Sequence, residues 1–226
     1  MSRRPFPLAA ACLAACLLPA AAGAAQPGAA DPALTASIVQ IEHQWAHITY
    51  EVKDGDAKYA QYKALAAQAS ALAARYPQNA EPLVWQGVVT STEAGVAGSF
   101  SALGLAKEAR DLFQKAGRID MRALHGAIPT SLGSLYYLVP GFPLGFGDDD
   151  KARQYLQQGL AMDPNGLDSN YFYGDFLYRQ EDYAQARAVL SHALQAPVTA
   201  DRPVWDAGRR RQIRDLLAKV NSKLAS

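Results

Sequence analysis

The chain has 226 residues, half of them hydrophobic, and a formal net charge of +1. This length suits one domain or a short repeat array, and the near-neutral charge gives no strong field to attract nucleic acid or an anionic membrane. Its 44 alanines and 25 leucines outnumber its 17 valines and isoleucines. This composition predicts an all-α protein and argues against a barrel or sandwich.

The first 24 residues have the pattern of a bacterial export signal. Two arginines precede a short apolar stretch, and small residues follow Pro19. Two processing routes remain open. Cleavage near Ala24 would release a soluble periplasmic protein, whereas a lipobox-like sequence ending at Cys16 would leave a lipid on that cysteine and tether the chain. Both cysteines lie in this segment, so the remaining chain has no disulfide or thiolate chemistry. Residues 25–33 are predicted to form a flexible linker.

Residues 34–226 carry an internal repeat of 34 residues. The spacing recurs between Ala152 and Ala186, between Leu156 and Leu190, and between Gly159 and Ala193. This is the period of the tetratricopeptide repeat, in which small residues let two helices approach closely. Gly174 stands twelve positions before Ala186, as a first helix of such a repeat requires. Ala109 precedes Ala152 by 43 residues, which predicts an insertion of about nine residues at Pro140–Asp148.

These patterns predict an α-solenoid, a right-handed stack of tetratricopeptide-like helix hairpins over residues 34–226. A first hairpin is expected from residues 34–53 and 57–76, and a last helix, residues 205–224, is expected to cap the stack. Such hairpins bury their apolar faces against their neighbours and leave a concave groove lined by first helices. The surface is typical of binding proteins, so we expect a non-enzymatic function without a cofactor.

Four motifs add a more specific resemblance. They are AEPLVW at residues 80–85, SLGSLYYLVPGFP at 131–143, GFGD at 145–148 and DSNYFYGDFL at 168–177. Together they are similar to the T-component family of TRAP transporters, periplasmic tetratricopeptide-like proteins. The resemblance implies an adaptor whose partner is a periplasmic solute-binding protein that hands ligands to a membrane transporter. The alternative is a scaffold for envelope protein assembly without a small-molecule ligand. A small hydrophobic ligand and a homo-oligomer are both compatible with the sequence.

Aromatic and polar side chains gather on two successive first helices and on the loop between them, which predicts a recognition groove. Tyrosine suits such a groove because it combines an apolar body with a polar tip. Adjacent residues such as Tyr136 and Tyr137 cannot both face the groove, and Asn170 and Asp175 have alternative roles as a helix cap and a partner for a neighbouring helix. The predicted binding residues are Tyr136, Tyr137, Phe142, Phe146, Asp148, Asn170, Tyr171, Tyr173 and Asp175.

The Pro140–Asp148 loop has two interpretations. Its glycines, prolines and apolar side chains are unusual for a surface loop, so it is either a lid folded into the groove or a structural plug between repeats. We expect Phe146, between two glycines, to be a buried anchor and Phe142 to be an exposed contact. Asp148 is expected to cap the helix that follows.

Two further patterns have less specific interpretations. His43 and His47 have the i, i+4 spacing of a zinc metalloprotease helix, but Gln44 replaces the glutamate base and no third ligand is evident. A metal-dependent hydrolase is therefore the minor alternative. The four arginines within residues 209–214 are expected to lie on a solvated last helix and to pair with nearby acidic residues, with docking to an acidic partner or to lipid headgroups as the alternative.

Overall fold

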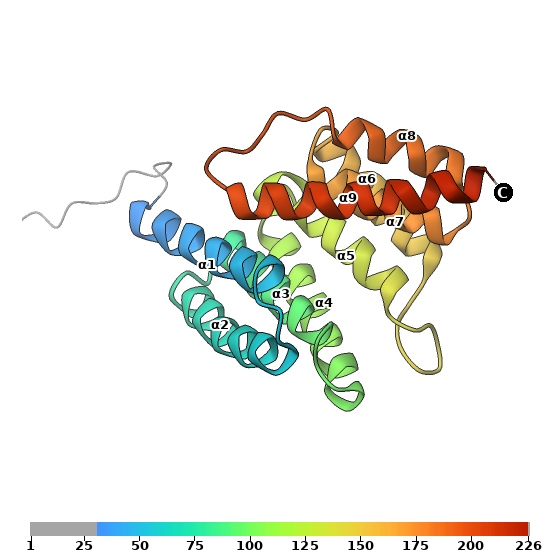
Figure 1. The fold of residues 1–226 in the computed structure, drawn as a ribbon. Helices are drawn as coiled ribbons and strands as arrows, with labels where there is room; N and C mark the ends of the chain where they lie inside the picture. Colours follow the sequence, from blue (N-terminus) through green and yellow to red (C-terminus); the bar gives the residue numbers. More distant parts are fainter. Residues whose placement is uncertain (1–30, 226) are drawn as a thin grey trace, which may run out of the picture. The chain divides into compact units, whose positions relative to one another are not determined.

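The structure is a computed structural model that describes residues 31–225, except for the side chains of residues 99 and 100. The predicted export signal with Cys16, and most of the predicted linker, lie outside the described residues. Within residues 31–225 the chain forms nine α-helices and one 3₁₀ turn (Figure 1). They are α1 (Pro32–Tyr50), α2 (Gly55–Arg75), α3 (Ala80–Ala94), α4 (Ser99–Asp120), η1 (Ala123–Gly126), α5 (Ala127–Leu138), α6 (Asp149–Met162), α7 (Leu167–Arg179), α8 (Tyr183–Ala193) and α9 (Pro203–Leu224). The all-α prediction is confirmed.

Local sequence signals explain where several helices begin. Four helices start after an Asp or Asn whose side chain accepts a hydrogen bond from a backbone N–H of the first turn. These caps are Asp54, Asn79, Asp148 and Asp182. The Asp148 Oδ1 accepts from the Lys151 amide at 3.0 Å, so the predicted cap of α6 is confirmed. Pro203 stands at the start of α9, where its fixed φ suits the helix. Its missing N–H costs nothing there, because the first N–H groups of a helix have no partner within the helix.

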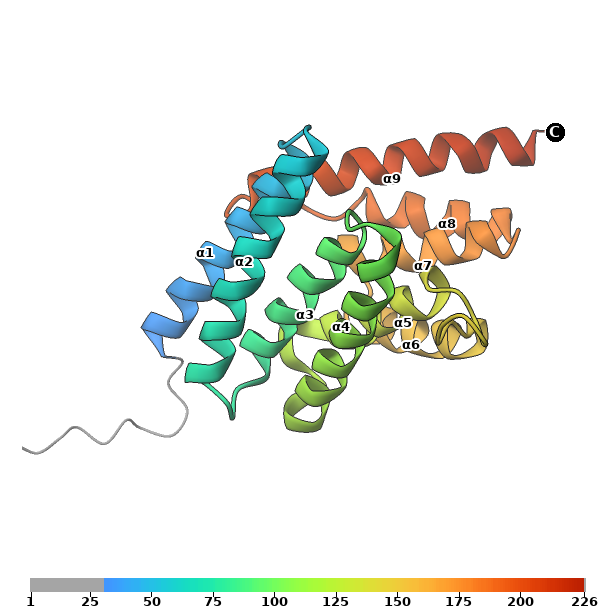
Figure 2. The same cartoon turned by 90° about the horizontal axis from the view of Figure 1, so that it is seen from below.

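Three helix hairpins, α3/α4, α5/α6 and α7/α8, repeat one packing device. A glycine of the first helix faces a large side chain of the second, and a Cβ atom on that glycine would lie 2.6–2.8 Å from it. The pairs are Gly87 with Phe113, Gly133 with Leu156, and Gly174 with Leu190. The three second-helix alanines predicted to be equivalent, Ala109, Ala152 and Ala186, are all fully buried. Glycine therefore sets the close approach within each hairpin, and Figure 2 shows the hairpins side by side.

The predicted nine-residue insertion is divided between two places. Gly133 precedes Ala152 by 19 residues and Gly174 precedes Ala186 by 12, so the Pro140–Asp148 loop accounts for seven extra residues. The other two lengthen the connection between α4 and α5, which contains η1. Placing all nine in the loop was wrong because the sequence period gives the total length added and not its distribution over two connections.

The last helix does more than cap the stack. Its apolar side packs on α7 and α8 as predicted, and Ile213 and Val220 are fully buried there. Its first half also reaches α1 (Figures 1 and 2). Gly208 lies there against the ring of Tyr50. The helix therefore joins the first helix of the described residues to the last hairpin.

Two residues of α9 hold the long connection from α8. Arg210 forms an ion pair with Asp206 at 2.7 Å and donates to the carbonyls of Ala196 and Pro197 at 2.9 Å. Burial acts to raise the pKa of Asp206, but hydrogen bonds from Arg210 and from the Thr199 amide outweigh it and lower the pKa. Within residues 31–225, no helix has both the length and the apolar character needed to cross a bilayer.

Candidate functional site: a central cavity

A cavity of about 310 Å³ lies on the inner side of the helix stack. Its walls come from the first helices α1, α3, α5 and α7, from η1, and from the beginning of α9. First helices line the concave side of a solenoid, so the cavity occupies the predicted groove. The α1 and α9 walls, which meet in the contacts described above, make it more enclosed than an open groove.

All three tryptophans of the chain line this cavity. Trp45 contacts Trp85 edge to face at a centroid distance of 6.0 Å, and its indole N–H donates to the Thr92 Oγ1 at 3.2 Å. The Arg202 guanidinium lies over the ring of Trp205 at 4.0 Å. The walls therefore combine broad aromatic surfaces with a few polar groups, as is usual for small-molecule sites.

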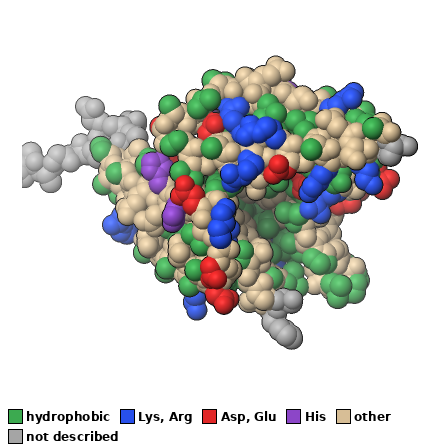
Figure 3. Space-filling model, in the orientation of Figure 1, with side chains coloured by type: hydrophobic (Ala, Val, Ile, Leu, Met, Phe, Trp, Pro, Cys, Tyr) green, Lys and Arg blue, Asp and Glu red, His purple; other side chains and the backbone are tan. Residues whose placement is uncertain are grey.

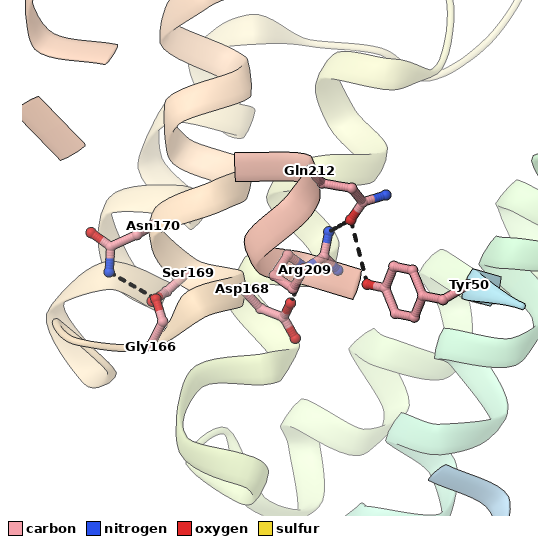
Figure 4. Close-up of polar contacts among 7 residues, drawn as sticks. All are labelled: Tyr50, Gly166, Asp168, Ser169, Asn170, Arg209 and Gln212. Carbon is pink, nitrogen blue, oxygen red and sulfur yellow. Dashed lines mark hydrogen bonds and ion pairs between the residues drawn. The ribbon is translucent and has the colours of Figure 1, made fainter. Parts of the chain in front are cut away.

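Two ion pairs cross the cavity walls between helices distant in sequence. Arg202 pairs with Glu42 of α1, and Arg209 of α9 pairs with Asp168 of α7 at 2.6 Å. Figure 4 shows Arg209 between Asp168 and Gln212, with Tyr50 of α1 on the other side of Gln212. Burial acts to lower the pKa of Arg209, but the carboxylate of Asp168 outweighs it and raises the pKa above its usual value. These pairs attach α9 to both sides of the groove.

Left-handed backbone occurs where η1 meets the cavity. Leu124 and His125 have φ values of 52° and 51°, and Gly126 follows with φ 91°. Non-glycine residues in this region cost on the order of 1–3 kcal/mol each, so the surrounding packing must hold them there. All three residues line the cavity. Two of the three non-glycine residues with positive φ in the described chain therefore lie at the cavity wall, and the third is Glu181 in the α7–α8 turn. Such backbone strain is typical of ligand and switch sites.

Comparisons with known proteins agree with this architecture. Residues 144–219, which include α6, α7, α8 and most of α9, match the tetratricopeptide repeat family model. The fold is tetratricopeptide-like. The crystal structure of a thermophilic TPR protein from Thermus thermophilus is similar to this chain, with 15% sequence identity and a TM-score of 0.53 over 83% of this chain and 100% of that one. No curated protein matches the chain. The prediction of a tetratricopeptide-like α-solenoid is confirmed.

None of the nine predicted binding residues lines the central cavity of this tetratricopeptide-like stack. Three of them, Tyr136, Phe146 and Asp148, lie around the start of α6. Tyr136 is buried, stacked on Tyr155 at 5.7 Å and in edge contact with Phe146 at 5.7 Å. Phe146 also lies under the Arg110 guanidinium at 4.6 Å. This group is packing between repeats.

A second group joins α5 to α7. The Tyr137 hydroxyl donates to the Asp175 carboxylate at 2.8 Å, and Arg179 pairs with the same carboxylate at 3.0 Å. Burial and the neighbouring Asp175 raise the pKa of Tyr137 well above its usual value. The alternative role of Asp175, as a partner for a neighbouring helix, is therefore confirmed.

The remaining predicted residues also make internal contacts. Asn170 does not cap α7 but donates to the carbonyl of Gly166 at 2.8 Å (Figure 4). It also donates to the carbonyl of Pro164 at 2.9 Å, and the two bonds fasten the turn from α6. The prediction that Asn170 caps this helix was wrong because α7 begins three residues earlier, at Leu167, and Gly166 stands at the cap position. Tyr171 lies under Arg209 at 4.5 Å, and Tyr173 is buried.

The Pro140–Asp148 loop is folded mainly on itself. The Gly147 amide donates to the Pro140 carbonyl at 2.9 Å, so the two ends of the loop lie together. Phe142 at the tip is 92% exposed and Leu144 is 73% exposed, and Figure 3 shows hydrophobic surface at the lower right where this tip lies. The loop is not a lid over the central cavity. Phe146 packs as the anchor, as predicted, although it is half-buried rather than buried. Phe142 is exposed, as predicted, but it does not face the groove, because it does not line the cavity.

The two phenylalanines of this loop should differ in their effect on stability. Phe146→Ala is expected to lower the free energy of unfolding by about 1–3 kcal/mol, because its half-buried ring packs on Tyr136. Phe142→Ala is the matched control and should change it by less than about 0.5 kcal/mol, because its ring is exposed. Urea unfolding followed by circular dichroism measures both. Equal losses would contradict this assignment.

The histidine pair on α1 makes other contacts. His43 Nε2 donates to the Asp201 carbonyl at 3.1 Å, and His47 pairs with Glu51 at 2.7 Å. No group of three potential His, Cys, Asp or Glu metal ligands occurs in the described part of the chain. Nothing in residues 31–225 or in the comparisons points to a hydrolase.

The arginine run on α9 is not a uniformly solvated face. Arg209 and Arg210 make the internal ion pairs described above, whereas Arg211 and Arg214 are exposed. Lys and Arg side chains still mark the face along α9 in Figure 3. The expected pairing with acidic residues is found for Arg209 and Arg210. The expected solvation was wrong for Arg209, because that residue shares the helix side of Trp205 and Ile213, which faces the core.

Alkaline pH should weaken the contact between α1 and α9. Burial raises the pKa of Tyr50 from 10.0 to about 12. Between these values the unfolded chain loses the phenolic proton while the folded chain retains it, so stability falls as pH rises, by about 2–3 kcal/mol in total for this group. Urea unfolding at pH 9–12 should show a shallower decline for Tyr50→Phe than for the unmodified protein. Parallel declines would show that Tyr50 does not contribute.

Proposed function

We propose that this protein is a non-enzymatic adaptor of the bacterial envelope that acts by binding a protein partner. The tetratricopeptide-like stack carries this proposal, since repeat solenoids present extended surfaces for partners. The predicted export signal supports the periplasm as its compartment. The resemblance to T-components supports a role beside a periplasmic solute-binding protein of a TRAP-type transport system.

The partner contact is placed at the tip of the Pro140–Asp148 loop. Phe142, Leu144 and the nearby Leu138 are the large apolar side chains exposed on this part of the surface. An apolar cluster on a self-supported loop can be covered by a partner without disturbing the core, whereas single exposed apolar residues are ordinary. The tip is therefore the surface we expect the adaptor to use.

Affinity capture from an envelope extract tests the proposal. The tagged protein should enrich a periplasmic solute-binding protein identified by mass spectrometry. Phe142→Ala should reduce this enrichment. Val198→Ala is the control and should not, because Val198 is a single apolar side chain, 73% exposed on the α8–α9 connection and outside the cluster at the loop tip.

Two other results would redirect the assignment. Enrichment of envelope assembly proteins, with no small molecule in the captured complex, would favour the scaffold role over the transport role. Equal capture by wild type and by Phe142→Ala would place the partner contact elsewhere. Recovery of the protein only from the cytoplasmic fraction would contradict the envelope assignment.

A further inference from the structure

Trp85 and Trp205 each bury an indole N–H that meets no acceptor among the described residues. Each of the two residues is only 7% exposed, and both line the central cavity. The indole nitrogen is a donor only, and a buried donor without an acceptor destabilises the folded protein. Two such donors in the walls of one cavity indicate that something outside the chain supplies the acceptors.

Trp45 shows what a satisfied indole in the same cavity looks like. Its N–H donates to the Thr92 Oγ1 at 3.2 Å, so the chain itself provides its acceptor. The three tryptophans thus share the cavity wall but differ in hydrogen bonding. A ligand with acceptor atoms should therefore act on the indole N–H groups of Trp85 and Trp205 and not on that of Trp45. A ligand held by ring contacts alone would not discriminate among the three tryptophans in this way.

The two arginines on the cavity wall are paired with carboxylates, unlike the two indole N–H groups. Arg202 forms an ion pair with Glu42, and Arg209 forms one with Asp168. Apolar side chains such as Val84, Val88 and Phe172 form the rest of the lining with the tryptophan rings. A complementary ligand therefore has acceptor oxygens at one end and an apolar body.

We infer that the central cavity binds a small organic molecule through carbonyl or carboxylate oxygens that accept hydrogen bonds from the indole N–H groups of Trp85 and Trp205. The apolar body of the ligand lies against the tryptophan rings. A volume of about 310 Å³ is at the lower end of the range for small-molecule sites. This site goes beyond the adaptor role and does not depend on the partner contact at the loop tip.

Three probes of equal chain length test the chemistry of this site: octanoate, octanamide and octylamine. The chain has three tryptophans, so a ¹⁵N-labelled sample gives three indole N–H signals. Octanoate, octanamide or both should shift the Trp85 and Trp205 signals saturably and leave the Trp45 signal nearly unchanged. Octylamine, which lacks an acceptor oxygen, should not. A response to octanoate alone identifies an anionic ligand, and a response to both identifies a carbonyl acceptor.

Variants give an independent measurement of the same contacts. Trp85→Phe and Trp205→Phe should each weaken binding of the active probe about tenfold, the effect of one lost hydrogen bond. Trp45→Phe is the matched control and should stay within about twofold, because the N–H it removes is already satisfied by Thr92. Thermal melts establish which variants fold. If one does not, the indole signals of the unmodified protein still decide the question.

Three results would overturn the inference. They are no saturable shift with either oxygen-bearing probe, equal shifts with octylamine, and equal losses for all three tryptophan variants. The first result would also follow if buried water satisfied the two donors. Because these measurements use the isolated protein, they are separate from the capture experiment. Probe binding without partner capture would contradict only the adaptor role, and partner capture without probe binding would contradict only this site.

Discussion

Replacing Phe113 by alanine is expected to lower the free energy of unfolding by about 3–5 kcal/mol. The Phe113 side chain is fully buried in the α3/α4 hairpin, where its ring lies directly against Gly87. Truncation removes the ring and leaves a cavity that two helices already in close contact cannot collapse to fill. Since domains of this kind are stable by only about 5–15 kcal/mol, the loss should be large enough to read from urea unfolding.

A double-mutant cycle tests whether Gly87 and Phe113 act as a unit. Gly87→Ala alone would place a Cβ atom 2.8 Å from the ring and should destabilise by about 1–3 kcal/mol through overpacking. In the Phe113→Ala background the same methyl group enters vacated space, and alanine also favours the helix. The double variant should therefore be more stable than the sum of the two losses implies. Strict additivity would contradict the packing described for the hairpins.

The pair formed by Asp168 and Arg209 should respond unequally to removal of each partner. Asp168→Asn keeps the shape of the side chain but leaves the Arg209 cation buried without its carboxylate, and we expect a loss of about 3 kcal/mol. Arg209→Met removes the cation and keeps an apolar side chain against Tyr171 and Phe172. The Asp168 side chain is 40% exposed and can be hydrated, so the expected loss is only about 1 kcal/mol.

Urea unfolding at neutral pH measures both variants, and the charge-neutralised pair Asp168→Asn with Arg209→Met serves as the control. The double variant should resemble Arg209→Met alone, because the carboxylate matters only while the cation is present. A greater loss for Arg209→Met than for Asp168→Asn would contradict the burial assigned to the guanidinium.

The sequence period predicted the repeats because close helix packing needs particular residue sizes at fixed spacings. Ala109, Ala152 and Ala186 could be aligned by spacing alone, and all three are fully buried. The glycine of the last repeat was also found, but Gly87 and Gly133 were missed. Gly174 was identified because it stands twelve residues before the alanine of its second helix. In the other two hairpins a longer connection lies between the glycine and that alanine, so the spacing differs.

The central cavity could not be predicted in the same way because its wall depends on contacts between distant segments. Glu42 and Arg202 are 160 residues apart, and no period in the sequence relates α1 to α9. One signal was available. Trp205, Arg209 and Ile213 follow one another at four-residue steps, so a helix places the arginine on its apolar side. That position is better explained by a buried ion pair than by a solvated face.

The contact between α1 and α9 changes how this protein can unfold and how its architecture can vary. In a linear repeat array each unit touches only its neighbours, so the ends fray first and units can be added with little consequence. Here the outermost helices of the described chain pack on each other, and fraying at one end must break contacts made by the other. Unfolding should therefore be close to all-or-none. An inserted hairpin would separate α1 from α9. An open solenoid can vary its number of repeats, but here the contact between the two end helices closes a ring and fixes that number.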